Sequence, residues 1–347
     1  MRTIYVTILP LLFMATFSIA QDKSIEEERF VSVGGIEQWV TINGDDRTKP
    51  IILFIHGGPG STMSQFDNAM YNGWEREFVL VNWDQRGAGR TYGHDAPVEL
   101  TEEYLTENPL TVAQMTKDGI ELTRYLIDYL QQEKIILVGT SWGSILGIEM
   151  ALSNPELFYA YVGHAQFVNF SENINYAYKK VYNLAERGND QEVIEQLHSL
   201  GKPPYDNAKN YGQLLRVVKQ YERKSATPAP DAWFALAPAY DNEKDSKNRY
   251  DGDDYSFINL VGHKKLGIKS MVAEVDFSQD GLEFEIPVYL IQGAGDILTA
   301  TEINKPYFDK IAAPDKEYFL LPDAAHGHNQ SVVDQQYKVI TEYISFE

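Results

Sequence analysis

Short apolar runs, separated by helical or turn patterns, constrain the fold of this 347-residue chain more than any other feature. Ile51–Ile55, with the sequence IILFI, contains no polar side chain and leads directly into His-Gly-Gly-Pro-Gly. Continuous apolar character of this kind is typical of strands that are buried on both faces of a parallel sheet. Similar runs follow at Phe78–Trp83, Lys134–Gly139, Tyr159–Ala165, Pro287–Gly293 and Glu317–Pro322.

Helical patterns lie between several of these runs. Thr111–Leu130 carries apolar residues at mostly helical spacing, and its first residue can cap the helix. A second helix is predicted at Ser144–Ser153, where Asn154-Pro155 would end it. Near the start of the chain, two β-rich segments flank Gly34-Gly35 and predict a hairpin. Alternating strands and helices indicate an α/β protein with a mostly parallel, doubly wound sheet.

The alternation stops between about residues 166 and 285, where segments such as QEVIEQLHSL are amphipathic. We therefore predict that residues 166–285 form a helical cap, inserted into a core made of residues 21–165 and 286–347. Within the cap, Lys224–Trp233 is predicted to be a Pro- and Ala-rich connector. The acidic segment Asp241–Asp254 is predicted to be a charged, exposed loop.

The amino terminus has the pattern of a signal peptide. Arg2 precedes an apolar run, and Ser18-Ile19-Ala20 is the small-x-small pattern of a cleavage site. We expect residues 1–20 to be removed and the protein to be exported, to the periplasm or outside the cell, without stable membrane association. An uncleaved membrane anchor is the alternative, but Pro10 and the shortness of the run favour cleavage.

The charge and the residue inventory exclude several classes of function. A formal net charge of -20 would repel nucleic acid and anionic lipid head groups, so we expect no nucleic-acid partner. The chain has no cysteine, which excludes disulfides, thiolate metal sites and cysteine nucleophiles. The histidines lack the spacing of metal ligands, and no P-loop precedes a helix, so no metal or other cofactor is expected.

Gly139-Thr140-Ser141-Trp142-Gly143 is a G-x-S-x-G motif between a predicted buried strand and a predicted helix. At a sharp strand-to-helix turn the serine hydroxyl is exposed, and the flanking glycines avoid collisions across the turn. The pentapeptide alone is weak evidence, but this position makes it specific. The sequence therefore predicts Ser141 as a catalytic nucleophile.

A serine nucleophile needs a histidine base, and usually a carboxylate that fixes the tautomer of that histidine. In this type of fold the acid and then the histidine follow the serine along the chain. Asp296 and His326 each come just after a predicted strand, so we predict Asp296 as the acid and His326 as the base. Asp296 could instead only cap a helix that begins near Ile297, and His328 is the competing base.

The glycine-rich segment after Ile51–Ile55 suits an oxyanion hole. Acyl transfer creates an oxyanion, and preorganised backbone N–H groups stabilise it. One donor follows the nucleophile, which predicts the Trp142 N–H, and the other comes from a glycine-rich loop after an earlier strand. We predict the Gly58 N–H as this second donor, with His56 orienting the loop through hydrogen bonds.

Three motifs in order resemble the proline iminopeptidase (prolyl aminopeptidase) family of α/β-hydrolases: His56–Gly60, Asp84–Thr91 and Gly139–Ser144. The resemblance covers about Ile51 to Ala165 and, less tightly, the chain from Pro287 onward. It implies an α/β-hydrolase fold with an inserted helical cap, and a serine hydrolase that removes an amino-terminal residue, typically proline, without metal or cofactor. By motif position it also implies the roles given above to the nucleophile, the acid, the base and the two oxyanion donors.

The resemblance is weakest in the cap. Members of the family bind the substrate amine through cap glutamates, one of them in a Trp-Glu pair, and no Trp-Glu occurs in residues 166–285. Four residues are tentative substrate-binding candidates instead: Asp231, Trp233, Glu274 and Asp276. In the Asp84–Thr91 motif, Asp84 and Arg86 are expected to form a buried structural pair.

Three functions are compatible with these patterns. The leading one is an exported aminopeptidase that acts on short peptides through an acyl-enzyme. An esterase or amidase for small esters or lactones is the alternative, because it would need no amine-binding carboxylates. A catalytically inactive binding module is the third, and the complete set of predicted catalytic residues disfavours it. The sequence leaves the oligomeric state open.

Overall fold

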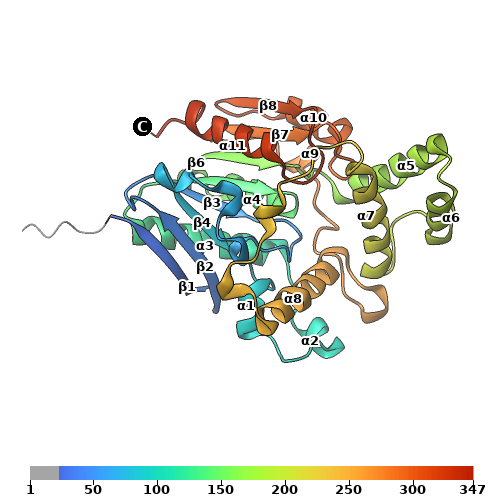
Figure 1. Cartoon of the computed structure of the whole chain (residues 1–347), viewed down its shortest axis with the longest axis horizontal. Helices are drawn as coiled ribbons and strands as arrows, with labels where there is room; N and C mark the ends of the chain where they lie inside the picture. The colour runs from blue at the N-terminus through green and yellow to red at the C-terminus, as the bar shows by residue number, and fades with distance from the viewer. Residues whose placement is uncertain (1–22, 347) are drawn as a thin grey trace, which may run out of the picture.

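The structure is a computed structural model that describes residues 23–346 (Figure 1). The predicted signal peptide and its cleavage site lie outside these residues, so export stays a prediction. In the described part of the chain, no helix is both long enough and apolar enough to cross a membrane.

The strands form one sheet of eight members with the order β1-β2-β4-β3-β5-β6-β7-β8. β1 and β2 form the predicted hairpin, β2 pairs with β4 in antiparallel fashion, and all other pairs are parallel. The predicted mostly parallel α/β sheet is therefore confirmed. The bounds are β1 (Ile25–Val33), β2 (Ile36–Gly44), β3 (Ile51–Ile55), β4 (Val79–Trp83), β5 (Ile135–Thr140), β6 (Phe158–His164), β7 (Val288–Gly293) and β8 (Lys316–Leu321).

The central strands are buried on both faces, because helices cover both sides of the sheet (Figure 1). In β3, Ile51, Leu53 and Ile55 belong to one hydrophobic layer, whereas Ile52 and Phe54 belong to the layer on the other side. Alternate side chains of a strand point to opposite faces, which explains why the run has no polar position. The outermost strand β8 differs from the prediction: it is only partly buried, since it has a neighbour on one side only.

The predicted core helices are present. Thr111 caps the first of them, because its side chain accepts a hydrogen bond from the Gln114 N–H at 3.1 Å. The second begins at Trp142, directly after Ser141 and two residues before the predicted start, and ends before the predicted Asn154-Pro155. The helices outside residues 166–285 are α1 (Gly89–Asp95), α2 (Glu102–Glu107), α3 (Val112–Leu130), α4 (Trp142–Ser153), α10 (Thr301–Lys310) and α11 (Gln330–Glu342).

Between β6 and β7 the chain leaves the sheet and forms four longer helices, which we call the cap: α5 (Phe170–Gly188), α6 (Gln191–Leu200), α7 (Ala208–Glu222) and α8 (Glu243–Val261). A short helix, α9 (Phe277–Asp280), precedes β7. α5, α6 and α7 pack together beyond the carboxyl ends of the strands, and α8 lies against α1 (Figure 1). The cap therefore stands over the edge of the sheet where the predicted catalytic loops emerge.

The prediction of a charged loop at Asp241–Asp254 is wrong, because most of this segment belongs to α8. Asn242 caps the helix by accepting from the Asp245 N–H at 2.9 Å, and acidic residues in a first turn interact favourably with the helix dipole. Arg90 then pairs with Asp245 at 2.9 Å. The high charge therefore reflects tertiary partners and a capped helix rather than a solvated loop.

Candidate active site

Ser141 lies at the turn between β5 and α4 with a backbone φ of 54°. A positive φ is rare for a residue with a side chain, and such strain is concentrated at functional sites. Its N–H donates to the His164 carbonyl at 3.0 Å, which fixes the turn to the end of β6. Gly143 is required at this turn, because an added Cβ would lie 2.1 Å from the Ile55 carbonyl oxygen. The turn at Ser141 thus depends on close backbone contact between the serine motif and β3.

The three predicted catalytic side chains meet in one hydrogen-bonded line. His326 Nε2 lies 2.8 Å from Ser141 Oγ, and His326 Nδ1 lies 3.0 Å from Asp296 Oδ2. Asp296 is fixed in turn by Thr299, whose N–H and hydroxyl donate to its two carboxylate oxygens at 2.8 and 2.6 Å. Asp296 therefore faces the histidine and also accepts from the turn that follows it. The alternative of a helix that begins near Ile297 is wrong, because the next helix, α10, begins at Thr301.

The electrostatics of this line suit a base. Burial alone would raise the pKa of Asp296, but His326 and Thr299 outweigh burial and hold that pKa below its ordinary value. Burial would likewise lower the pKa of His326, but the carboxylate of Asp296 outweighs it and raises the pKa to about 8. An ionised acid thus faces a histidine that binds a proton readily.

His328, the competing base, lies elsewhere in the site. Its ring packs 4.6 Å from that of His164, and burial lowers its pKa to about 4. Within residues 23–346 its Nε2 atom has no hydrogen-bond partner. A histidine needs contact with the serine to act as its base, so the geometry favours His326 over His328.

The glycine-rich loop after β3 lies beside the nucleophile. Gly58, Ser141 and Trp142 line the same cavity, and Gly58 has a φ of 110°, which a residue with a side chain rarely adopts. Trp142 is the first residue of α4, where N–H groups have no acceptor within the helix. Both predicted oxyanion donors therefore border the cavity that contains Ser141, and their role as donors stays a prediction.

Gln85 is a residue at this loop that the sequence analysis did not identify. Its side-chain amide donates to the His56 carbonyl at 3.0 Å and accepts from the Trp142 indole at 2.9 Å. His56 holds the loop as well, with Nδ1 2.8 Å from the Gly57 carbonyl oxygen. Gln85 thus joins the glycine-rich loop to the nucleophile helix. Its position inside the Asp84–Thr91 motif was the available signal.

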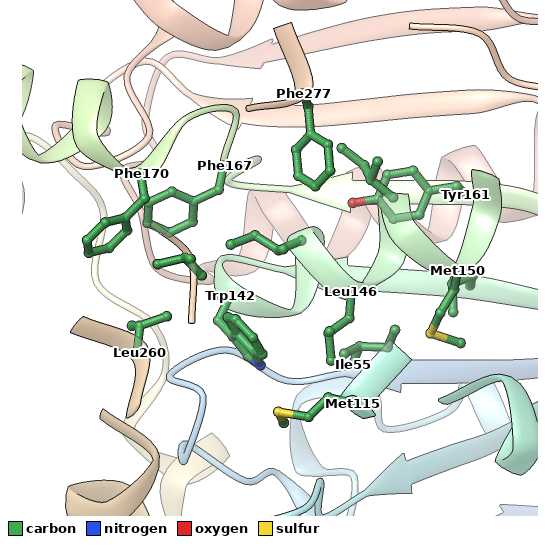
Figure 2. Packing of buried hydrophobic residues seen from close by; sticks show 14 of the residues in the cluster. Ile55, Met115, Trp142, Leu146, Met150, Tyr161, Phe167, Phe170, Leu260 and Phe277 are labelled. Atoms are coloured by element: carbon green, nitrogen blue, oxygen red, sulfur yellow. The ribbon is translucent and has the colours of Figure 1, made fainter. Parts of the chain in front are cut away.

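The cavity over the serine is small and apolar. It has a volume of about 40 Å³, and the cap supplies most of its wall. Phe167 and Phe170 stand on one side of the cavity and Trp142 and Leu260 on the other (Figure 2). The remaining lining residues are Ile145, Ile174, Leu215, Phe257, Val261 and Leu298. A site of this kind favours a small apolar group next to the reacting carbonyl.

Glu222, at the end of α7, is the second residue that the sequence analysis missed. Its Oε1 accepts from the N–H groups of Ile297 and Leu298 at 2.8 and 3.3 Å, and Leu298 lines the cavity. Burial and then the nearby Asp296 carboxylate raise the pKa of Glu222 to about 7. The signal in the sequence was Tyr221-Glu222, an aromatic residue followed by glutamate in the cap, where only Trp-Glu was sought.

The structure does not bring the four tentative substrate-binding residues to this cavity. Trp233 is buried in the hydrophobic layer that contains Phe54, and Asp231 is exposed beside it. Glu274 and Asp276 line a separate groove of about 1000 Å³ along α3, in which no catalytic side chain takes part. Sequence order alone could not place these residues, because the connections between α7 and α8 and between α8 and β7 pack away from the cavity of Ser141.

The expected pair of Asp84 and Arg86 is wrong. Arg86 pairs with Asp118 of α3 at 2.7 Å and also donates to the Gly34 carbonyl. Asp84 accepts instead from the Ser64 hydroxyl at 2.6 Å and from the Arg90 N–H at 2.9 Å. The two side chains diverge, because the chain turns at Arg86-Gly87, where Gly87 has a φ of 81°. Both remain structural, as expected.

No cluster of three or more potential metal-ligating side chains occurs in the part of the chain that the structure describes. The catalytic line itself contains one histidine and one carboxylate, both engaged with each other and with Ser141 or Thr299. The absence of a metal or other cofactor stays a prediction.

Comparison with known proteins identifies the family. The family model described as alpha/beta hydrolase fold matches residues 50–328, which include the nucleophile, the acid and the base. The chain belongs to the alpha/beta hydrolase family. The predicted fold and the prediction of an enzyme are thereby confirmed, and the family accounts for the order of serine, acid and histidine along the chain.

Individual relatives and solved structures are also similar to this chain. "Probable aminopeptidase YbaC" of Bacillus subtilis (strain 168) is 27% identical over 310 residues, covering 89% of this chain and 93% of the relative. The structure of proline iminopeptidase from Mycobacterium smegmatis superposes with a TM-score of 0.60 at 18% identity, covering 91% of this chain and 97% of that one. The structure of an esterase from Exiguobacterium antarcticum superposes with a TM-score of 0.56 at 14% identity, covering 91% of this chain and 99% of that one. The predicted resemblance is confirmed, and the two structures support the fold alone.

Proposed function

We propose that this alpha/beta hydrolase is an aminopeptidase, which releases the first residue of short peptides through an acyl-enzyme. The observation that carries the proposal is the position of Glu222. A buried cap carboxylate contacts the loop that carries the catalytic acid, and it does so at a residue of the cavity wall. An esterase would not need this charge to bind the amine of a substrate.

In the proposed reaction, Ser141 Oγ attacks the carbonyl carbon of the first residue while His326 Nε2 takes the hydroxyl proton. The N–H groups of Gly58 and Trp142 stabilise the oxyanion of the tetrahedral intermediate. The scissile C–N bond then breaks as His326 returns the proton to the leaving amine. Water, deprotonated by His326, attacks the acyl-enzyme and releases the first residue as a free amino acid. Asp296 keeps the imidazole in the required tautomer throughout.

The protonated amine of the substrate would supply the missing partner of Glu222. Within residues 23–346 the carboxylate accepts from two backbone N–H groups, and no lysine or arginine pairs with it. Burial and then the nearby Asp296 carboxylate raise the pKa of Glu222 to about 7, and His326 and the two backbone N–H groups offset only part of this rise. A bound ammonium group would stabilise the ionised form, so binding favours peptides with a free amino terminus.

The test compares substrates that differ in the amine and in the leaving group. Purified protein is assayed with alanine and proline 4-nitroanilides, with N-acetylalanine 4-nitroanilide and with 4-nitrophenyl acetate, using Ser141→Ala as the blank. We expect Ser141-dependent cleavage of the free-amine anilides and at least tenfold lower kcat/KM for the acetylated one. Anilide cleavage that does not depend on the free amine would contradict the proposal.

A pair of cap variants tests the role of Glu222. Glu222→Gln keeps an oxygen that can accept from Ile297 and Leu298, but it removes the charge. We expect KM for the free-amine anilides to rise about 10- to 100-fold, the value of a charge-assisted hydrogen bond, with the ester unaffected. Glu186→Gln, at an exposed position of α5, is the matched control. Equal loss on ester and anilides would assign Glu222 to the support of the acid loop.

Esterase activity is the second candidate, because the cavity wall is almost entirely apolar and could bind an uncharged acyl group equally well. Cleavage of 4-nitrophenyl acetate without cleavage of any anilide would establish it. The triad and the oxyanion loop would keep their roles, and only the assignment of Glu222 would fall.

We also propose export after cleavage at Ala20, on the basis of the leader pattern alone. Amino-terminal sequencing of the protein from its host cells is the test. A mature sequence that begins at Gln21 is expected, and one that begins at Met1 would contradict the proposal.

A further inference from the structure

A second cavity adjoins the one over the nucleophile. It has a volume of about 270 Å³, compared with about 40 Å³ for the inner cavity that contains Ser141. Phe170, Ile174 and Val261 line both cavities, so their side chains are the partition between the two. We call the larger space the outer chamber. Its other walls are Ser171, Asn175, Pro203, Pro204, Tyr205, Tyr211, Ser270 and Ala273.

Aromatic rings run from the catalytic histidine into the outer chamber. The His326 ring lies 6.5 Å from Phe167, which lies 6.1 Å from Phe170. Phe170 is 6.0 Å from Tyr211, and Tyr211 is 5.1 Å from Tyr205. Phe167 and Phe170 border the inner cavity (Figure 2), and Tyr211 and Tyr205 border the outer chamber. Aromatic walls of this kind bind apolar and aromatic groups by contact with their faces and edges.

We propose that the outer chamber is the distal part of the acyl-binding site, and that it holds the end of a bulky apolar or aromatic side chain of the first residue. The inner cavity has room for only a small group next to the carbonyl. A longer side chain must pass between Phe170, Ile174 and Val261, where it enters a space several times larger. The inference rests on the proposed acyl transfer at Ser141 and adds the class of acyl group.

The outer chamber is a better candidate for this role than the groove along α3. The groove shares no lining residue with the cavity of Ser141, whereas the chamber shares three. The chamber wall also carries no ionised side chain, since its polar members are hydroxyl and amide groups. Its chemistry therefore matches an uncharged side chain, and the charge of the substrate amine stays with Glu222.

The experiment fills the outer chamber and compares short with bulky acyl groups. Ala273→Trp is suitable because Ala273 lines the chamber and is exposed, so a larger side chain need not disturb the core. Alanine and phenylalanine 4-nitroanilides form one substrate pair. The two esters, 4-nitrophenyl acetate and 4-nitrophenyl 4-phenylbutyrate, form the other. We expect the wild type to prefer the bulky member of each pair, and the variant to lose about tenfold in kcat/KM for the bulky members only.

Two further variants keep the result interpretable. Ala235→Trp, at an exposed position of the connector before α8, is the matched control and should change neither ratio. Phe170→Ala thins the partition and should raise the preference for bulky acyl groups, a gain that loss of folding cannot imitate. Thermal melts of all variants accompany the assays.

The outcomes separate this inference from the proposed function. Cleavage of both esters but of neither anilide would refute the aminopeptidase, while the ester pair would still decide the inference. An equal fall for short and bulky substrates in Ala273→Trp would make the chamber an entrance and overturn the inference. So would unchanged ratios in both chamber variants, or the absence of Ser141-dependent turnover on all four substrates.

Discussion

The core and the cap each place a buried carboxylate near His326, and the two carboxylates are held in different ways. Asp296, from the core, accepts hydrogen bonds from both donor groups of Thr299 and faces the imidazole. Glu222, from the cap, accepts from two backbone N–H groups of the acid loop. The pKa of Asp296 is held below its ordinary value, whereas that of Glu222 is raised to about 7.

This difference distinguishes a carboxylate whose ionised form is stabilised by its neighbours, Asp296, from one whose ionised form is disfavoured by burial, Glu222. The histidine and the threonine stabilise the ionised form of Asp296 at all times, as the base requires. Burial disfavours the ionised form of Glu222 until a cation arrives. In the proposed function, the core thus supplies the reaction chemistry and the cap supplies a charge that binds the amine of the substrate.

The largest effect should come from removing the charge of each carboxylate in a separate variant. Asp296→Asn should lower kcat about 10⁴-fold for esters and anilides alike, because the neutral amide no longer fixes the imidazole tautomer. Glu222→Gln should leave the kcat for 4-nitrophenyl acetate within threefold. Steady-state kinetics of both variants on both substrate types is the measurement. A Glu222→Gln variant as inactive on the ester as Asp296→Asn would end the distinction.

A smaller effect is expected from adding one methyl group to a core glycine and to a cap glycine. Gly143→Ala should cost about 3 kcal/mol in the free energy of unfolding, since the new Cβ would lie 2.1 Å from the Ile55 carbonyl oxygen. Gly212→Ala, inside α7, has only the end of the Arg216 side chain near it, 3.6 Å away. It should gain about 0.5–1 kcal/mol, because alanine favours a helix over glycine.

Urea denaturation of these two variants gives the comparison directly. Similar losses of unfolding free energy in both variants would mean that the cap is packed as tightly around Gly212 as the turn at Ser141 is around Gly143. A stable Gly143→Ala variant would show that the contact between α4 and β3 can relax.

Below about pH 7, kcat/KM for the free-amine anilides should fall about tenfold more per pH unit than kcat/KM for the esters. His326, with a pKa raised to about 8, must lose its proton to act as base, so kcat/KM for the ester should rise through pH 8 and then level. For the anilide, protonation of Glu222 below about pH 7 should steepen the acid side. Loss of the substrate's own ammonium proton, near pH 8, should make the profile bell-shaped.

The measurement is kcat/KM from pH 5 to pH 10 for both substrates, in the wild type and in Glu222→Gln. In the variant the acid side of the anilide profile should become parallel to that of the ester. Parallel profiles already in the wild type would mean that Glu222 does not bind the amine.

The smallest effects are expected at the acidic groove along α3. Glu274→Gln should change kcat/KM for alanine 4-nitroanilide less than twofold, because this side chain lines the groove and not the cavity of Ser141. Gln279→Ala, at an exposed position of α9 that lines neither the groove nor the cavities, controls for local disturbance. A tenfold loss in Glu274→Gln alone would restore this residue as part of the substrate-binding site.

Much of the core could be predicted from the sequence, because its signals are local. A run such as Ile51–Ile55 has one structural explanation, and it ends where the glycine-rich loop begins. Ser141 could be found because strain at a strand-to-helix turn demands glycines at fixed distances along the chain. The partners of Asp84 and Arg86 were not predictable in this way, since Ser64 and Asp118 reach them from other elements.

In the cap, the same approach identified helices but not their contacts. Asp241–Asp254 was predicted to be a loop because it is highly charged, yet Lys247 pairs with Asp251 along α8 and Arg90 pairs with Asp245 from the core. Glu222 is an ordinary helix residue by sequence, and its burial arises only when α7 meets the loop after Asp296.

The sequence by itself determined the strands of the sheet and singled out Ser141, Asp296, His326 and the glycine-rich loop, which the structure brings together. Periodicity, glycine spacing and chain order are properties of the chain that hold before it folds. Only the tertiary structure decided which cap carboxylate approaches the triad and which two cavities share a wall. Those properties depend on how helices that are distant in sequence pack over the sheet, and packing leaves no fixed spacing in the chain.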